Sequence, residues 1–424
     1  MKLAVVGGGS TYTPELVAGL ARERERIDLT ELVLHDIDAE RRDVVGGLAE
    51  RMLSAAGYPG QLAVTDDLDR ALDGAGFVLV QLRVGGQAAR LTDETVPLAC
   101  GCIGQETTGA GGLGKALRTV PVVLEIAARA RELADDGAWI VDFTNPVGIV
   151  TRALRDAGHR AVGLCNVAIG VQRLIARLLD VAPERVFVDQ VGLNHLTWVR
   201  AVQVDGRDLL TEILADHGDA LAEQAAQPRA VLDELGAIPS YYLHYFYFHD
   251  DVLAAQRDGV PRAATVAEIE RELLRLYRDP SLTTKPKLLE QRGGAYYSEA
   301  ATQLVASLST GAGDVQVVDV RNEGAIDGLA ADDVVELPAR IEREGPVPLP
   351  QPPLAPELLG LVQHVASYER LAAAAAIAGD RMLVHKALLA HPLIGQVPQA
   401  DELVDLLLTS GAEYLPQFQG KALA

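Results

Sequence analysis

A glycine-rich turn between a short apolar segment and a segment of helical period constrains this chain more than any other feature. Residues 3–6 are apolar and predict a buried strand, and residues 14–25 predict an amphipathic helix. Between them lies Gly-Gly-Gly-Ser-Thr at 7–11, and Tyr12 stands where the usual fingerprint has its third glycine. Such a turn lets backbone N–H groups meet a pyrophosphate at the helix N-terminus. It favours a dinucleotide site over a strand–turn–helix without a nucleotide.

Strand and helix patterns then alternate through the first 165 residues. We expect strands at 31–34, 77–82, 139–143 and 161–164, and helices at about 118–134 and 148–157. This alternation predicts an α/β fold with a Rossmann-type, doubly wound parallel sheet.

Asp36 ends the second expected strand, where a carboxylate accepts hydrogen bonds from ribose hydroxyls and disfavours a 2′-phosphate. NAD is therefore preferred to NADP. The predicted cofactor-binding residues are Gly7, Gly9, Ser10, Thr11 and Asp36.

The alternation fades after residue 165. Residues 186–190 and 197–204 look like strands of a more antiparallel region, with Asp205-Gly206 as a hairpin turn. The rest is expected to be mostly helical, at 266–277, 299–307, 357–378 and 380–389, with the proline-rich segment 346–356 as an ordered connector. We therefore predict two domains in a lactate/malate dehydrogenase-like architecture: residues 1–165 bind NAD, and residues 166–424 form an α+β domain for substrate, metal and oligomerisation.

The charge balance restricts the partners. Asp and Glu number 59 against 38 Lys and Arg, a formal net charge of −21. Such a surface repels nucleic acid and anionic lipid, so neither is an expected partner, and an anionic substrate would need a local basic pocket. Three cysteines form no disulfide framework, the first apolar run is too short for a signal peptide, and no run is long enough for a membrane span. We expect a cytoplasmic protein.

Two separated fragments each place a metal-binding side chain beside an asparagine. Cys165 follows the strand expected at 161–164 and precedes Asn166, and His195 follows Asn194. Thiolate and imidazole can bind a divalent transition metal, although two ligands leave a site that substrate oxygens must complete. The alternative is a buried free cysteine and a core histidine. A metal beside a nicotinamide site indicates that a carbonyl made by oxidation must also be polarised.

Three more segments are candidates for the site. The polar, glycine-rich segment 104–112 is expected to be a loop that lines a site, with a plain surface loop as the alternative. Asn145 follows the strand expected at 139–143. The aromatic segment 241–248 indicates core or interface packing for most of its members. Any tyrosine in it that acts as a base needs a cation or metal to lower its pKa from about 10.

Together these fragments resemble the family 4 glycoside hydrolases, most closely the 6-phospho-β-glucosidase branch, from Val5 to about His391. The matching pieces are Val-Gly-Gly-Gly-Ser-Thr-Tyr-Thr-Pro-Glu-Leu at 6–16, Leu-Arg-Val-Gly-Gly at 82–86, Gly-Gln-Glu-Thr-Thr-Gly at 104–109, Phe-Thr-Asn-Pro-Val-Gly at 143–148, Cys-Asn-Val at 165–167, Gly-Leu-Asn-His-Leu at 192–196 and Arg-Gly-Gly-Ala-Tyr-Tyr-Ser at 292–298. Their number and order make the resemblance specific.

The resemblance implies hydrolysis of phosphorylated β-glucosides by an unusual route. NAD takes a hydride from the sugar C3 hydroxyl, and Mn²⁺ (or another divalent metal), held by Cys165, His195 and the sugar O2 and O3, polarises the resulting ketone. A tyrosinate removes the C2 proton, the C1 aglycone is eliminated, water adds, and NADH returns the hydride. The implied base is Tyr242, with Tyr241 as the second choice.

The resemblance also implies substrate contacts. Asn166 aligns with an aspartate that acts as the acid in the α-glucoside branch. Asparagine cannot donate a proton usefully, so the leaving group here should need little acid help. The implied substrate-binding residues are Arg90, Asn145, Asn166 and Arg262, with Arg292 as a further candidate. His244 stands where the branch more often has arginine, a departure that bears on the preference for a 6-phosphate.

Two other functions remain alternatives. A lactate- or malate-type NAD-dependent 2-hydroxy-acid dehydrogenase would need a catalytic His paired with Asp, and His195 has no such partner motif nearby. A non-catalytic NAD-binding sensor would leave Cys165, His195 and Tyr242 without chemical roles. The expected partner is a small phosphorylated glycoside, and the aromatic segment makes a homo-oligomer, a dimer or a tetramer, the expected assembly.

Overall fold

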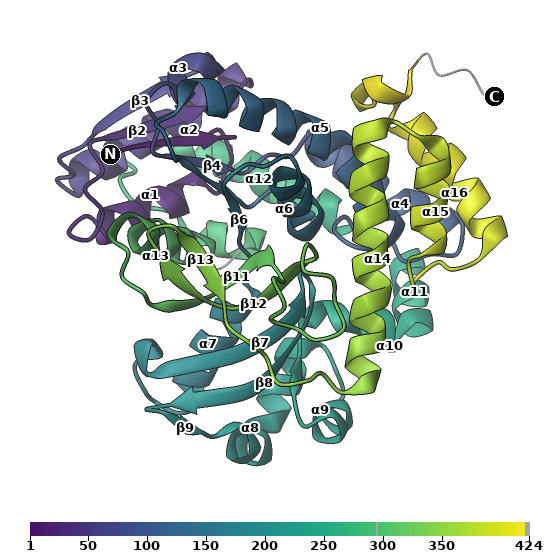
Figure 1. The fold of residues 1–424 in the computed structure, drawn as a ribbon. Coiled ribbons are helices and arrows are strands. Elements are labelled where there is room, and N and C mark those ends of the chain that lie inside the picture. Colours follow the sequence, from purple (N-terminus) through teal and green to yellow (C-terminus); the bar gives the residue numbers. More distant parts are fainter. Residues whose placement is uncertain (294–295, 420–424) are drawn as a thin grey trace.

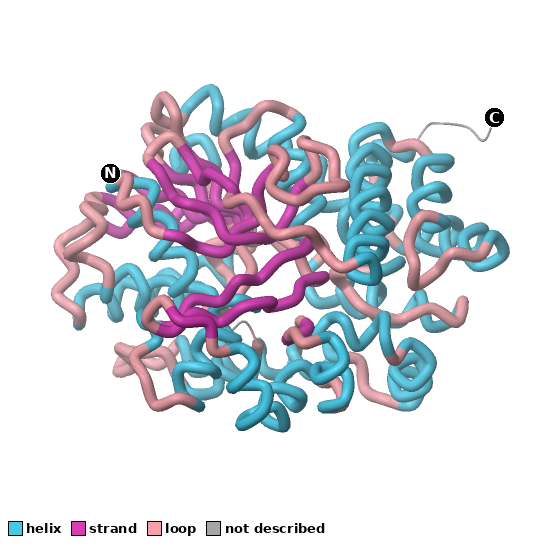
Figure 2. The backbone as a smooth tube through the Cα atoms, turned by 60° about the horizontal axis from the view of Figure 1, so that its bottom comes forward, coloured by secondary structure: helices cyan, strands magenta, loops and turns pink. Residues whose placement is uncertain are grey.

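The glycine-rich turn joins β1 (Lys2–Val6) to α1 (Thr13–Arg22), as its sequence predicts. The computed structural model describes residues 1–293 and 296–419. Gly294 and Ala295, which belong to the motif at 292–298, lie outside the described residues. The strands of the described part form one continuous 13-stranded sheet, and helices pack around it (Figures 1 and 2).

One half of this sheet has the Rossmann strand order. Parallel strands follow one another as β3-β2-β1-β4-β5-β6, which confirms the predicted fold class. The strands after β1 are β2 (Glu31–His35), β3 (Gln61–Thr65), β4 (Phe77–Val80), β5 (Trp139–Asp142) and β6 (Ala161–Gly163). Strands β4, β5 and β6 are buried along their whole length, because helices cover both faces of a parallel sheet.

The helices of this half are α1, α2 (Ala39–Ala55), α3 (Leu68–Leu72), α4 (Gly86–Ala99), α5 (Gly109–Leu133) and α6 (Val147–Asp156). The start of α5 corrects one prediction. Segment 104–112 is a loop only as far as Thr108, and its last glycines form the first helical turn. Gly111 packs so closely on α4 that an added Cβ would lie 2.3 Å from the Asp93 carbonyl oxygen. Close packing accounts for Gly111 and Gly112, whereas Gly109 has a positive φ of +62°.

The other half of the sheet is antiparallel and joins the first half where β11 pairs with β6. Its strands are β7 (Val186–Leu193), β8 (Leu196–Val204), β9 (Arg207–Asp208), β10 (Ile238–Pro239), β11 (Val315–Arg321), β12 (Val334–Glu342) and β13 (Gly345–Pro348). The predicted hairpin turn at Asp205-Gly206 connects β8 to β9, and both turn residues have positive φ. The expectation of mostly helix after residue 205 is wrong for β11, β12 and β13.

The remaining helices are α7 (Val167–Leu178), α8 (Leu210–Ala225), α9 (Arg229–Leu235), α10 (His244–Tyr247), α11 (His249–Asp258), α12 (Arg262–Tyr277), α13 (Tyr297–Thr310), α14 (Pro356–Ala378), α15 (Arg381–Leu389) and α16 (Val397–Ser410). The long helix α14 packs against α5, α6 and α15 (Figure 1). Helices α12 and α13 pack back onto α4 and α1. The division of the chain at residue 165 stays a prediction. Within the described ranges, none of the helices combines the length and the apolar character that a bilayer crossing requires.

Candidate active site

The glycine-rich turn has the geometry of a dinucleotide cradle. Gly7 has φ of +91°, and an added Cβ there would lie 2.6 Å from the Gln81 carbonyl oxygen. Gly9 approaches Asp36 so closely that its N–H donates to Oδ2 at 2.8 Å. The other oxygen of Asp36 accepts from the Asp38 N–H at 3.0 Å. Because each carboxylate oxygen has a second lone pair, Asp36 can still accept from ribose hydroxyls. The turn and Asp36 therefore fit NAD.

Glu270 on α12, for which the sequence predicted no role, connects this turn to the rest of the site through hydrogen bonds. Its carboxylate accepts from the Thr11 hydroxyl at 3.2 Å, from Arg41 Nη2 at 3.1 Å and from Arg292 Nη2 at 2.8 Å. The Arg292 guanidinium also lies over the Tyr12 ring, 5.4 Å from its centroid. Arg292 thus stands beside the predicted NAD site.

His195 lies in the two-residue connection between β7 and β8 with φ of +65°, a conformation in which histidine is among the enriched residues. Its ring stacks on Tyr242 of η2 (Tyr241–Leu243), with centroids 3.7 Å apart and planes at 11°. Its Nδ1 lies 3.0 Å from Thr107 Oγ1, which leaves Nε2 for a metal ion. Thr107 belongs to the polar segment at 104–112, so that segment does reach the candidate site.

Cys165 follows β6 at the carboxyl edge of the parallel strands, where open α/β sheets bind ligands. The Asn194 side chain lies close enough to its sulfur to act on the thiol. Cys165 also lies close enough to Tyr242 for its charge to act on the phenol. The structure therefore brings Cys165, His195 and Tyr242 together, as the resemblance implies.

The pKa shifts of these three groups are consistent with a site that binds a cation. Burial raises the pKa of the Cys165 thiol, and the carboxylates of Glu336 and Asp319 raise it further. Burial lowers the pKa of His195 to about 3, so its imidazole is neutral and can bind a metal. Burial and then the Cys165 charge raise the pKa of Tyr242. A divalent cation would oppose the shifts at the thiol and the phenol.

The donor set also fits a metal that the substrate must complete. No cluster of three or more His, Cys, Asp or Glu side chains in residues 1–293 and 296–419 is arranged to hold an ion. Cys165 and His195 offer one sulfur and one nitrogen, which suits a divalent transition metal. Oxygens of a bound sugar or water would fill the remaining positions.

A buried ionic network lies beside this group. Glu106 pairs with Arg83, with Arg90 Nε at 3.1 Å and with Lys115 Nζ at 2.6 Å. Burial alone would raise the pKa of Glu106, but these cations outweigh burial and hold the pKa well below its usual range. Because three cations meet one carboxylate, the network is a local basic environment in an acidic chain.

The other predicted substrate contacts lie around this network. Glu94 accepts from Arg90 Nε at 2.7 Å and from the Ala263 N–H at 2.7 Å, which brings Arg90 close to the start of α12 and Arg262. Asn145 follows β5, and its Oδ1 is buried without a hydrogen-bond partner among the described residues. Asn166 caps α7 directly after Cys165.

His244, the position where the resemblance expects arginine, is buried and its ring nitrogen contacts the Tyr241 carbonyl oxygen. Tyr241 itself has 45% of its surface exposed, and its ring meets Tyr242 edge-on at 5.8 Å. It does not stack on His195 as Tyr242 does. This arrangement favours Tyr242 over Tyr241 as a base.

Several residues of this region had no role predicted from the sequence: Arg83, Glu106, Thr107, Lys115, Asn194, Glu270 and Glu336. Thr107 and Glu106 belong to a polar segment that the sequence had marked, so their signal was present. Glu270 lies in an ordinary amphipathic helix, and only its burial against distant arginines reveals it.

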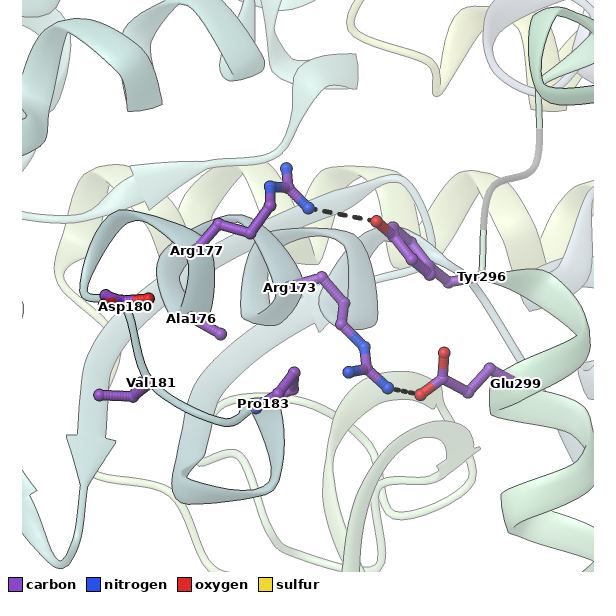
Figure 3. A pocket seen from close by; sticks show the side chains of 8 residues that line it. All are labelled: Arg173, Ala176, Arg177, Asp180, Val181, Pro183, Tyr296 and Glu299. Carbon is purple, nitrogen blue, oxygen red and sulfur yellow. Dashed lines mark hydrogen bonds and ion pairs between the residues drawn. The ribbon is translucent and has the colours of Figure 1, made fainter. Parts of the chain in front are cut away.

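Two cavities adjoin α7. A hollow of about 470 Å³ lies toward the end of the helix, where Arg173 pairs with Glu299 and Arg177 donates to the Tyr296 hydroxyl at 3.2 Å (Figure 3). None of the predicted site residues lines it. A smaller cavity of about 100 Å³ reaches Cys165 from the side of Ile169 and Val317.

Known proteins are similar to this chain over nearly its whole length. Residues 2–181 match the profile of the family 4 glycosyl hydrolases, and residues 190–394 match the C-terminal domain of that family. A probable 6-phospho-β-glucosidase of Bacillus subtilis (strain 168) is 41% identical over an alignment that covers 99% of this chain and 98% of the relative.

Solved structures agree. The 6-phospho-β-glucosidase of Thermotoga maritima with manganese, NAD⁺ and glucose-6-phosphate is 34% identical, covers 98% of this chain and 99% of its own, and superposes with a TM-score of 0.90. Malate dehydrogenase of Plasmodium falciparum, at 13% identity and a TM-score of 0.54 over 89% of this chain and 98% of its own, shares the fold alone. The chain therefore belongs to the family 4 glycosyl hydrolases.

Proposed function

We propose that this chain hydrolyses 6-phosphorylated β-glucosides, with NAD and a divalent metal ion such as Mn²⁺ as cofactors. Relatives of that activity align over the full chain, and one related structure holds manganese, NAD⁺ and glucose-6-phosphate. The observation that carries the proposal is the stacking of His195 on Tyr242, 3.7 Å apart, in one group with Cys165 at the carboxyl edge of the Rossmann sheet.

When bound, NAD accepts and returns a hydride, and the metal ion polarises a sugar oxygen beside the carbon that loses a proton. Cys165 Sγ and His195 Nε2 would hold the ion, and Thr107 would keep the imidazole in the required orientation. Tyr242 would take the proton at its phenol oxygen, with its ring held in place by His195. Asn166 would orient the sugar without supplying a proton, which suits a leaving group that needs no acid.

Arg90, Arg262 and Arg292 are the proposed contacts for the anionic substrate, and Asn145 offers its unpartnered oxygen to a sugar hydroxyl. The His244 ring contacts the Tyr241 carbonyl oxygen of η2, so we assign the 6-phosphate to the arginines. The homo-oligomer and the cytoplasmic location stay predictions. Tyr241 and Tyr247 of the aromatic segment are exposed and available for such an interface.

The test compares three substrates with purified protein, Mn²⁺, NAD and a thiol reductant. We expect release of 4-nitrophenol from 4-nitrophenyl-β-glucoside 6-phosphate, far slower release from the unphosphorylated glucoside, and no NADH from malate or lactate. NADH formation from a 2-hydroxy acid, with no glycoside turnover, would contradict the proposal in favour of a dehydrogenase. Equal turnover of both glucosides would contradict the assignment of the arginines to a phosphate.

A further inference from the structure

A row of buried carboxyl groups crosses the sheet beneath the proposed metal site. Residues opposite one another in neighbouring strands lie on the same face of a sheet. Five neighbouring strands contribute one residue each to this row, and each residue is paired with the next. In order they are Asp142 of β5, Gly163 of β6, Asp319 of β11, Glu336 of β12 and Gly192 of β7. The three acidic residues of the row have at most 1% of their surface exposed.

Two residues of the candidate site follow the two glycines of this row. Cys165 comes two residues after Gly163, and Asn194 comes two residues after Gly192. Both residues lie just past the ends of their strands, β6 at Gly163 and β7 at Leu193, so the following turns and not the sheet register place their side chains.

Glu336 differs from its neighbour in the row by its partners. Its Oε2 accepts from Asn194 Nδ2 at 2.9 Å, and its Oε1 accepts from Gln190 Nε2. Gly192, opposite Glu336, has no side chain, so the carboxylate reaches the diagonal neighbours on both sides of it. Neither carboxyl oxygen of Asp319 has a hydrogen-bond partner among the described residues. Glu336 is therefore the carboxylate of the row that is linked to the site.

Asn194 connects this carboxylate to the thiol. Its amide nitrogen has two hydrogens, so it can serve Glu336 and the Cys165 sulfur together. Cys165 also borders the cavity of about 100 Å³, so packing on that side does not fix its rotamer. A hydrogen bond from an oriented amide would fix it. Were the amide turned over, its oxygen would face the thiolate and repel it.

We propose that Glu336 is a positioning residue that orients the Cys165 thiolate through Asn194. The inference rests on the proposed function, because it takes Cys165 as a metal ligand. Partners of this outer kind, which orient a ligand without touching the ion, typically change metal affinity about 10- to 100-fold when removed. The charge of Glu336 is not needed for the effect. The effect depends on the two acceptor oxygens of Glu336, because they require the amides of Asn194 and Gln190 to face Glu336 with their nitrogens.

The test is a titration of the metal-free full chain with Co²⁺, read by the thiolate-to-cobalt charge-transfer absorption in the near ultraviolet. The wild type should show the band, and Cys165→Ser should lack it. Glu336→Gln offers only one acceptor, so we expect a weaker or shifted band and about tenfold or greater loss of Co²⁺ affinity. Gln190→Met is the matched control, because it removes the donor on the other oxygen of Glu336 and should leave band and affinity unchanged.

Two more variants separate positioning from folding. Asn194→Leu removes the donor to sulfur without touching the buried row and should reproduce the change of Glu336→Gln. The double variant Gln190→Glu with Glu336→Gln should restore the band. The new glutamate at position 190 accepts from the amide nitrogen of the new glutamine at position 336, and the amide oxygen of that glutamine then faces Asn194. Asn194→Leu with a wild-type band and affinity would overturn the proposal. A wild type without a Cys165-dependent band would instead overturn the metal site of the proposed function.

Discussion

Replacing Glu270 by glutamine should destabilise the chain, because Glu270 is a buried carboxylate between two arginines. Its surface is 4% exposed, and it pairs with Arg292 and Arg41 while accepting from Thr11. A glutamine can keep the bonds on one oxygen. Its amide nitrogen would then face the Arg41 guanidinium, donor against donor, and leave that charge without its partner.

The size of the effect follows from the burial of the pair. Removing one partner of a buried ion pair costs about 3–5 kcal/mol. Arg41 keeps 29% of its side chain exposed, so water can solvate it and we expect about 3 kcal/mol. At about 2 °C per kcal/mol or less for a unit of this size, the thermal midpoint should fall by about 3–6 °C.

The pH dependence provides a second signature. Burial by itself raises the pKa of Glu270, but the charges of Arg292 and Arg41 outweigh burial and leave the pKa below its ordinary value. A carboxylate with a depressed folded-state pKa stabilises the protein above its unfolded pKa, and this stability is lost as the pH falls through the folded value. The gap between wild type and Glu270→Gln should therefore be full at pH 7 and narrow below about pH 4.5.

The assay is thermal unfolding without NAD, from pH 7.5 to pH 4. Glu272→Gln is the matched control, because Glu272 lies on the same helix in an exposed pair with Arg275 and should change the midpoint little. If Glu270→Gln unfolded at the same temperature as Glu272→Gln at pH 7, or if its deficit did not shrink in acid, the argument about the buried pair would be refuted.

Other predictions concern the metal and the cofactor. Cys165→Ser and His195→Ala should each abolish turnover while fluorescence titration still shows NADH binding, because the glycine-rich turn is a separate site; turnover that survives thorough chelation would contradict the metal role. Asp36→Ala should weaken NAD binding by about 1.5–3 kcal/mol, because charge-assisted hydrogen bonds to the ribose and to Gly9 are lost. Asp36→Asn keeps an acceptor and should weaken binding less. Calorimetric titration measures the affinity of both variants. Hydrolysis should need NAD yet accumulate no NADH, and stoichiometric NADH in the absorbance trace would show that the hydride does not return.

The parts of the fold that the sequence predicted well are those with a local signal. A short stretch of sequence predicts strand β1, the glycine-rich turn and α1, because the apolar run, the glycines and the helical period follow one another directly. Strands β11 and β12 were missed because each carries a buried acid, Asp319 or Glu336, in the middle of its apolar run, and Pro338 interrupts β12 further. A buried charge that a distant partner satisfies has no local pattern.

The candidate site shows the same division. Cys165 and His195 could be marked as metal ligands from residue type, but only the turn between β7 and β8 puts His195 against Tyr242. The roles of Glu270 and Glu336 depend on partners far away in the chain, such as Thr11 and Asn194, so no window of sequence contains them. Residue types alone therefore predicted the candidate metal ligands, whereas the groups that support them became apparent only in the folded structure.

We propose that the C2–H bond of the sugar breaks and reforms during hydrolysis, with Tyr242 as the base. The most direct measurement is turnover of 4-nitrophenyl-β-glucoside 6-phosphate in D₂O, with the product examined by NMR and mass spectrometry. We expect deuterium at C2, because the intermediate is reprotonated from solvent, and we expect Tyr242→Phe to lose most turnover while still binding Co²⁺. Label with a fully active Tyr242→Phe would move the base to Tyr241. Product without deuterium at C2 would contradict the elimination mechanism itself.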